Sequence, residues 1–168
     1  MAEKKITSVT SVPSLADNDS VFVNQGDTLK QISKSNLLPL PENKILWSGG
    51  YYMSEDHTAS LSEPVSAQEH GIVLVWTPYI DGTPQNWGWV YNFVPKFHII
   101  LNSLIGNGAL GVDCPLLRGS VDVIGCKTLH IDDTKISGNA INVGTGTNSY
   151  SGIVYTNNYW VLRYVIGV

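Results

Sequence analysis

The chain has 168 residues, of which 14% are charged, and its formal net charge is −4. A chain of this length forms one ordinary domain, or one domain with a small appendage, and can bury enough apolar surface to fold without a metal or a disulfide. Lys and Arg form no run anywhere. This argues against a nucleic-acid groove and against attraction to an anionic membrane surface.

Residues 1–40 are predicted to form a small β-rich module. Residues 6–9 and 20–24 are β-prone, and residues 28–33 alternate polar and apolar side chains as a half-buried strand does. Pro39 and Pro41 cannot continue a helix or a central strand, so we place the boundary there.

The first residues lack the apolar stretch of a signal peptide, and no run reaches the length of a membrane span. We therefore expect no secretion signal and no membrane insertion.

Residues 41–168 read as short strands with turns between them. Residues 71–77 are apolar on both alternating faces, which predicts a central strand that is buried on both sides. An apolar run follows Pro95, residues 102–119 are expected to be mostly loop, and no segment longer than about 10 residues shows a helical stripe. Other strands are predicted at residues 44–47, 57–62, 87–94, 121–124, 127–131 and 158–168. The pattern predicts an all-β fold, with a β-sandwich or jelly-roll-like domain over residues 41–168.

The sequence carries no recognisable catalytic or metal-binding set. The four histidines show no zinc-ligand spacing: His57, His70, His98 and His130. The neighbouring acids Glu55-Asp56 and Asp132-Asp133 are typical of solvated turns. We expect no enzyme, no metal and no cofactor. A small glycan-cleaving enzyme is the alternative, and it would need two carboxylates, such as Asp81 and Asp113, to meet across a cleft.

The two cysteines, Cys114 and Cys126, show no Cys-x-x-Cys spacing. We expect two reduced, buried thiols in a protein made in a reducing cytosol, and a disulfide between them is the alternative.

Aromatic residues are the most unusual feature of the chain. Trp87, Trp89 and Tyr91 alternate along a predicted strand and would share one face of it. Sugars stack their C–H faces on such rings, while nearby amides and carboxylates bind hydroxyl groups. The candidate glycan-binding residues are Tyr79, Asp81, Gln85, Asn86, Trp87 and Trp89, with Tyr79 and Trp87 expected to be exposed. The alternative is that the rings fill the core or a subunit interface.

Several runs resemble tail proteins of phages and prophages of Gram-positive bacteria. The first is Ile-Leu-Trp-Ser-Gly-Gly-Tyr-Tyr-Met at residues 45–53, and residues 71–76 and 92–96 are similar to such proteins as well. Residues 133–138 and 160–163 extend the similarity toward the end of the chain. Residues 15–23 resemble the N-terminal module of phage tail fibre and baseplate proteins.

This resemblance implies a receptor-binding protein at the tip of a bacteriophage tail. It implies a homotrimer that is made in the bacterial cytoplasm and carried in the virion. Residues 1–40 would attach to other tail or baseplate proteins, and residues 41–168 would bind a host cell-wall polysaccharide or teichoic acid. A purely structural tail component without glycan binding is the main alternative. No functional residue is carried over from the family.

Overall fold

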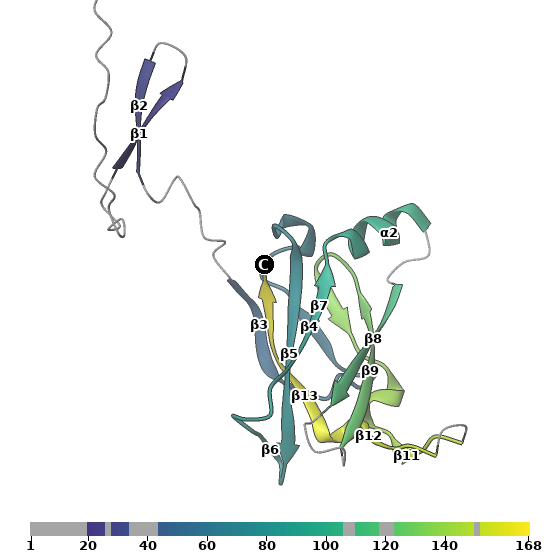
Figure 1. Cartoon of the computed structure of the whole chain (residues 1–168). Helices are drawn as coiled ribbons and strands as arrows, with labels where there is room; N and C mark the ends of the chain where they lie inside the picture. Colours follow the sequence, from purple (N-terminus) through teal and green to yellow (C-terminus); the bar gives the residue numbers. More distant parts are fainter. Residues whose placement is uncertain (1–19, 26–27, 34–43, 106–109, 118–122, 150–151) are drawn as a thin grey trace, which may run out of the picture. The chain divides into compact units, whose positions relative to one another are not determined.

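The computed structural model describes residues 20–25, 28–33, 44–105, 110–117, 123–149 and 152–168 (Figure 1). The chain divides into two compact units, Met1–Glu42 and Asn43–Val168. In the first unit, strands β1 (Ser20–Gln25) and β2 (Thr28–Ser33) pair antiparallel, and strands were predicted at residues 20–24 and 28–33. The expected strand at residues 6–9 lies outside the described residues.

The second unit is an all-β domain, which confirms the predicted fold class. One antiparallel sheet has the order β3 (Lys44–Tyr51), β13 (Trp160–Gly167), β5 (Gly71–Ile80) and β7 (Val90–Pro95), and the short β6 (Thr83–Pro84) pairs with the end of β5. The other has the order β4 (Thr58–Ser60), β10 (Lys135–Ser137), β9 (Ile124–Ile131) and β8 (Leu110–Leu117). A separate hairpin joins β11 (Thr145–Thr147) to β12 (Val154–Thr156).

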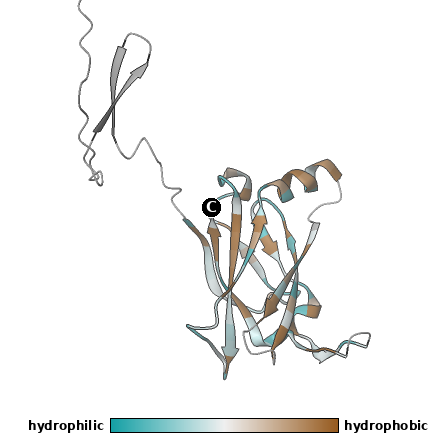
Figure 2. Cartoon of the chain, in the orientation of Figure 1, coloured by the Kyte–Doolittle hydropathy of each residue, from teal (hydrophilic) through white to brown (hydrophobic). Residues whose placement is uncertain are grey.

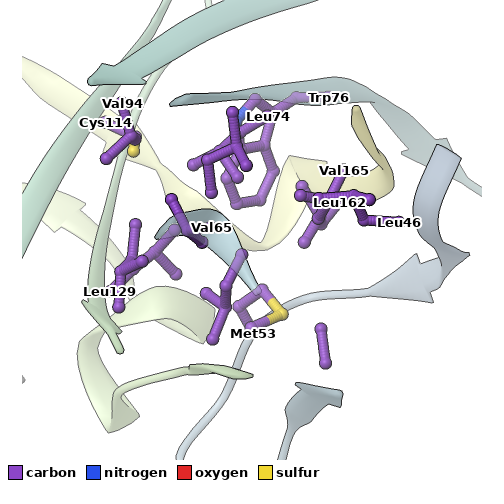
Figure 3. Close-up of a cluster of buried hydrophobic side chains, with 14 of the residues drawn as sticks. Leu46, Met53, Val65, Leu74, Trp76, Val94, Cys114, Leu129, Leu162 and Val165 are labelled. Carbon is purple, nitrogen blue, oxygen red and sulfur yellow. The ribbon is translucent and has the colours of Figure 1, made fainter. Parts of the chain in front are cut away.

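The core lies between these two sheets (Figure 3). Leu74 and Trp76 of β5 and Leu162 of β13 enter it from one side, and Cys114 of β8 and Leu129 of β9 enter it from the other. All five side chains are almost completely buried. Removing this much apolar surface from water is the main stabilising term of the domain.

The central position of β5 explains its composition. Strands β13 and β7 pair with its two edges, so both of its backbone edges are satisfied. Ile72, Leu74 and Trp76 alternate with Val75 and Thr77, and all five are buried. The prediction of a strand buried on both sides is therefore confirmed.

The stretch after Pro95 differs from the prediction. Residues 97–105 form a helix, α2 (Phe97–Ile105), and the expected loop of residues 102–119 contains the strand β8. The helix is held by tertiary contacts: His98 is buried, Ile99 packs against the core, and the Asn102 side-chain amide donates to the Ile131 backbone oxygen at 2.8 Å. Such contacts override a weak local preference, which is why the pattern alone did not show the helix.

The described part of this unit also contains three short 3₁₀ helices: η1 (Val65–Ala67), η2 (Ala140–Val143) and η3 (Asn157–Tyr159). Among the described residues, no helix is long and apolar enough to cross a membrane.

Candidate functional site

The predicted glycan-binding residues gather around the hairpin that joins β5 to β6. Ile80 pairs with Thr83, and the two residues between them, Asp81 and Gly82, have φ angles of 50° and 76°. Positive φ at both positions defines the tight turn that suits the twist of a hairpin, and Asp-Gly is among its preferred sequences. The hairpin therefore presents the Asp81 carboxylate to solvent at its tip.

Gln85 holds this hairpin closed. Its backbone N–H donates to the Pro78 oxygen at 2.8 Å, and its side-chain amide donates to the Thr83 oxygen at 2.9 Å. The amide nitrogen of Gln85 is thus used within the hairpin, so its side chain is positioned rather than free to move. Asn86, the next residue, is exposed.

Two tryptophans follow the hairpin and face solvent. The side chains of Trp87 and Trp89 are 40% and 37% exposed. The expected strand over residues 87–94 begins only at Val90, because Gly88 takes a positive φ of 66° that breaks the alternation. The Trp89 ring stacks on Tyr164 of β13, with ring centroids 6.3 Å apart. Trp87 is exposed as predicted.

Tyr79 is less exposed than predicted. Its ring is half-buried and meets the ring of Tyr52 edge-on, with centroids 4.9 Å apart. Such aromatic pairs are stabilising beyond the area that they bury. Tyr79 therefore supports the base of the hairpin, and the exposed rings beside it are those of Trp87 and Trp89.

A second aromatic group lies at the end of β3 and was not predicted as a site. Tyr51 stacks on His57 at 4.5 Å and packs against Trp47 at 5.0 Å, and Tyr51 remains 37% exposed. The His57 ring is fixed because its Nδ1 accepts a hydrogen bond from the Ser54 backbone N–H at 3.2 Å. Trp47 and Tyr51 lie four positions apart on one strand, so their contact is local. No sequence pattern predicts that His57 would pack against them.

The β5–β6 hairpin reaches this second group. A side-chain carbon built on Gly50 of β3 would come within 3.0 Å of the Pro84 ring of β6. The hairpin therefore lies beside the end of β3 that carries Tyr51. Exposed rings and the polar side chains of the hairpin thus share one end of the domain.

The carboxylates needed by the enzyme alternative are placed apart. Asp81 is at the tip of the β5–β6 hairpin, whereas Asp113 belongs to β8 of the other sheet and accepts a hydrogen bond from Thr128 at 2.8 Å. Cys114 and Lys127, the next pair along β8 and β9, point into the core, so Asp113 and Thr128 point outward. The two carboxylates therefore belong to different parts of the fold, the β5–β6 hairpin and the other sheet.

Asp132 and Asp133 accept hydrogen bonds from nearby backbone and hydroxyl groups. Asp132 Oδ1 accepts from the backbone N–H groups of Thr134 and Lys135, and Asp133 accepts from the backbone and the hydroxyl of Ser66. Within the described ranges, no three His, Cys, Asp or Glu side chains are grouped so as to hold a metal ion.

The cysteines lie on neighbouring strands but on opposite faces. Cys114 is opposite Lys127 and is buried, whereas Cys126 is opposite Pro115 and is exposed. Both are free thiols. Because Cys126 is exposed, the expectation that both thiols are buried is wrong for Cys126. Burial raises the pKa of Cys114 to about 12, which keeps this thiol neutral.

An open cavity of about 380 Å³ lies beside Cys126. Its walls come from β9, η2, η3 and the β11–β12 hairpin and are mostly apolar; they include Ile124, Cys126, Ile141, Ile153, Tyr155 and Asn157. None of the predicted glycan-binding residues lines it.

No protein-family model matches the chain, and no curated protein matches it. The resemblance to phage tail proteins therefore stays a prediction.

Proposed function

We propose that the chain is a non-enzymatic adhesion protein of a bacteriophage tail tip, whose Asn43–Val168 unit binds a cell-surface glycan. The observation that supports this proposal most is the exposure of Trp87 and Trp89 directly beside a rigid polar hairpin. Flat rings provide a surface for the C–H face of a sugar. Asp81 and Asn86 are exposed nearby and can bind its hydroxyl groups.

The rigidity of the hairpin favours binding. The Asp81-Gly82 turn and the two hydrogen bonds of Gln85 hold the polar groups in place before a ligand arrives. Groups that are already ordered lose less conformational entropy on binding. A shallow site of this kind binds each sugar weakly, and several copies in one particle would raise the overall avidity.

A structural role without glycan binding is the second candidate. It is favoured by Tyr91 and Phe93 of β7, which are 61% and 56% exposed. Aromatic rings of this kind are common at subunit contacts. Residues 1–40 would attach the chain to other tail proteins in both cases.

Calorimetric titration with purified cell-wall polysaccharide, and separately with teichoic acid, from Gram-positive bacteria tests the proposal. We expect Trp87→Ala and Trp89→Ala each to weaken binding about tenfold, which corresponds to about 1.4 kcal/mol. Ile45→Ala is the control, because it also removes an exposed apolar side chain, but one at the start of β3, away from the hairpin. Equal binding by all variants, or no binding by the wild-type protein to either polymer, would favour the structural role.

A further inference from the structure

Helix α2 turns two polar side chains toward the protein and exposes several apolar ones. Two of its three polar residues, His98 and Asn102, are four positions apart and so lie on one face of the helix. That face is turned toward the protein: His98 is buried, and the Asn102 amide donates to the Ile131 oxygen of β9 at 2.8 Å. A surface helix of a globular protein normally turns its apolar stripe inward.

The opposite face of α2 is apolar and faces solvent. Phe97, Ile100 and Leu104 are spaced by three and four positions, so they form one stripe. Their side chains are 56%, 48% and 73% exposed. Figure 2 shows the helix coloured as hydrophobic along most of its length. Contiguous apolar patches on a protein surface often mark sites of interaction with another surface.

The charge pattern indicates what kind of surface covers it. Between Asp81 and Asp113 the only charged residue is Lys96, and its ammonium group donates to the Gln68 backbone oxygen at 2.9 Å. A charged partner would therefore find no complementary group on the helix. An amphipathic helix that lies on a membrane usually carries Lys or Arg along its polar face, and α2 has neither.

A second copy of the chain meets these requirements. Each copy carries a net charge of −4, and contact through a face that lacks carboxylates brings no like charges together. This stretch is poor in charged residues and rich in aromatic ones, as is the central part of a protein–protein interface.

The exposed area is of the right order for such a contact. Tyr91 and Phe93 of β7 precede the helix and are 61% and 56% exposed. At roughly 200 Å² for each aromatic side chain, the two rings and Phe97 together leave about 350 Å² uncovered. Ile100 and Leu104 add to this area, and a standard interface buries about 800 Å² of each partner.

We infer that the outward face of α2, formed by Phe97, Ile100 and Leu104, is the contact surface between copies of this chain. In an assembly of identical chains, every copy contributes this face to the contact. The inference does not depend on glycan binding, since the β5–β6 hairpin contributes no residue to this face.

Light scattering and sedimentation equilibrium on the full chain test it. We expect the wild-type protein to form oligomers and Leu104→Glu to shift the mass to that of the monomer, because a charge would be buried in the contact. Leu104→Gln, which adds no charge, should weaken association as well. Ser60→Glu is the matched control: it places the same charge on an exposed residue of β4, outside the proposed contact face, and should leave the mass unchanged.

Leu104 is 73% exposed, so its replacement should leave the fold intact, which circular dichroism can check. A wild-type protein that stays monomeric up to its highest soluble concentration would overturn the inference. So would an unchanged mass in both Leu104 variants. Sedimentation of a monomeric wild-type protein with neutral phosphatidylcholine vesicles would identify a lipid surface instead. Unchanged glycan affinity per chain in Leu104→Glu would show that the two proposed surfaces are separate.

Discussion

The Lys127 ammonium group lies 2.7 Å from the backbone oxygen of Asn142, inside the domain, and it also donates to the Tyr52 oxygen at 2.9 Å. No part of the Lys127 residue is exposed. The Asn142 side chain in turn donates to the oxygens of Met53 and Thr128 and accepts from the Thr128 N–H. These two residues tie β9 and η2 to the segment that follows β3.

Burial of Lys127 predicts a pH-dependent stability. Burial lowers the pKa of Lys127 from its ordinary 10.5 to about 7. Between these values the unfolded chain holds one proton more than the folded chain, so the free energy of unfolding should rise with pH, by at most about 1.4 kcal/mol per pH unit. Below about pH 7 both states are protonated and the destabilisation is complete.

Urea unfolding between pH 7 and 9 measures this dependence. Above pH 9 the opposite effect of Cys114 begins, because its pKa is raised from 9.0 to about 12 and the unfolded thiol ionises first. Lys127→Met should remove most of the rise, whereas Lys135→Met, at an exposed lysine, should keep it. A rise of the same slope in Lys127→Met would contradict the assignment.

Asn142 should be far more important for stability than its neighbour Asn139. Asn142→Ala leaves buried backbone groups of Met53 and Thr128 without partners, and we expect a loss of about 3 kcal/mol. Asn139 accepts one hydrogen bond from the Ile141 N–H at the start of η2, so Asn139→Ala should cost about 1 kcal/mol. Equal losses in chemical denaturation would show that the buried network is not the stabilising element.

Two glycines provide a matched pair for close packing. A side-chain carbon at Gly138 would overlap the backbone of Met53 and Ser54, whereas one at Gly111 of β8 would meet nothing. Gly138→Ala should therefore lower the free energy of unfolding by several kcal/mol, and the melting temperature with it. Gly111→Ala should leave the melting temperature unchanged or raise it slightly. A tolerated Gly138→Ala would contradict the close contact between β10 and the segment after β3.

The two thiols should differ in reactivity. A thiol reagent added to the native protein should modify Cys126, which is exposed, and should reach Cys114 only after unfolding. Mass spectrometry after proteolysis distinguishes the two sites. Rapid modification of Cys114 in the native protein would mean that β8 opens readily from the core.

The elements that were predicted well are those whose pattern is local. The double-sided apolar run of β5 predicted a central strand, and the alternation of residues 28–33 predicted β2. The Asp81-Gly82 turn could also have been predicted as a hairpin rather than a loop, because the pair is a known turn sequence. Local preferences and the fold agree at these positions.

The elements that were missed depend on distant contacts. Gly125 interrupts the pattern of β9, yet the strand continues because the Trp160 ring covers that position: a side-chain carbon there would lie 2.6 Å from the ring. Helix α2 was missed because it is held by tertiary contacts, such as that of the Asn102 amide with the Ile131 oxygen, which no local pattern shows. Around the candidate site, Trp87 was predicted to be exposed and is, whereas the contact of Tyr79 with Tyr52 joins residues that are far apart in sequence.

Glycan binding at the β5–β6 hairpin is tested most directly by NMR spectroscopy of the five tryptophan indole N–H groups, in protein labelled with ¹⁵N at tryptophan. Trp76 and Trp160 are fully buried and serve as internal controls. On addition of cell-wall polysaccharide or teichoic acid, the indole signals of Trp87 and Trp89 should shift, while those of Trp76 and Trp160 stay in place. If the signals of Trp87 and Trp89 do not move with either polymer, the hairpin is not a glycan-binding site.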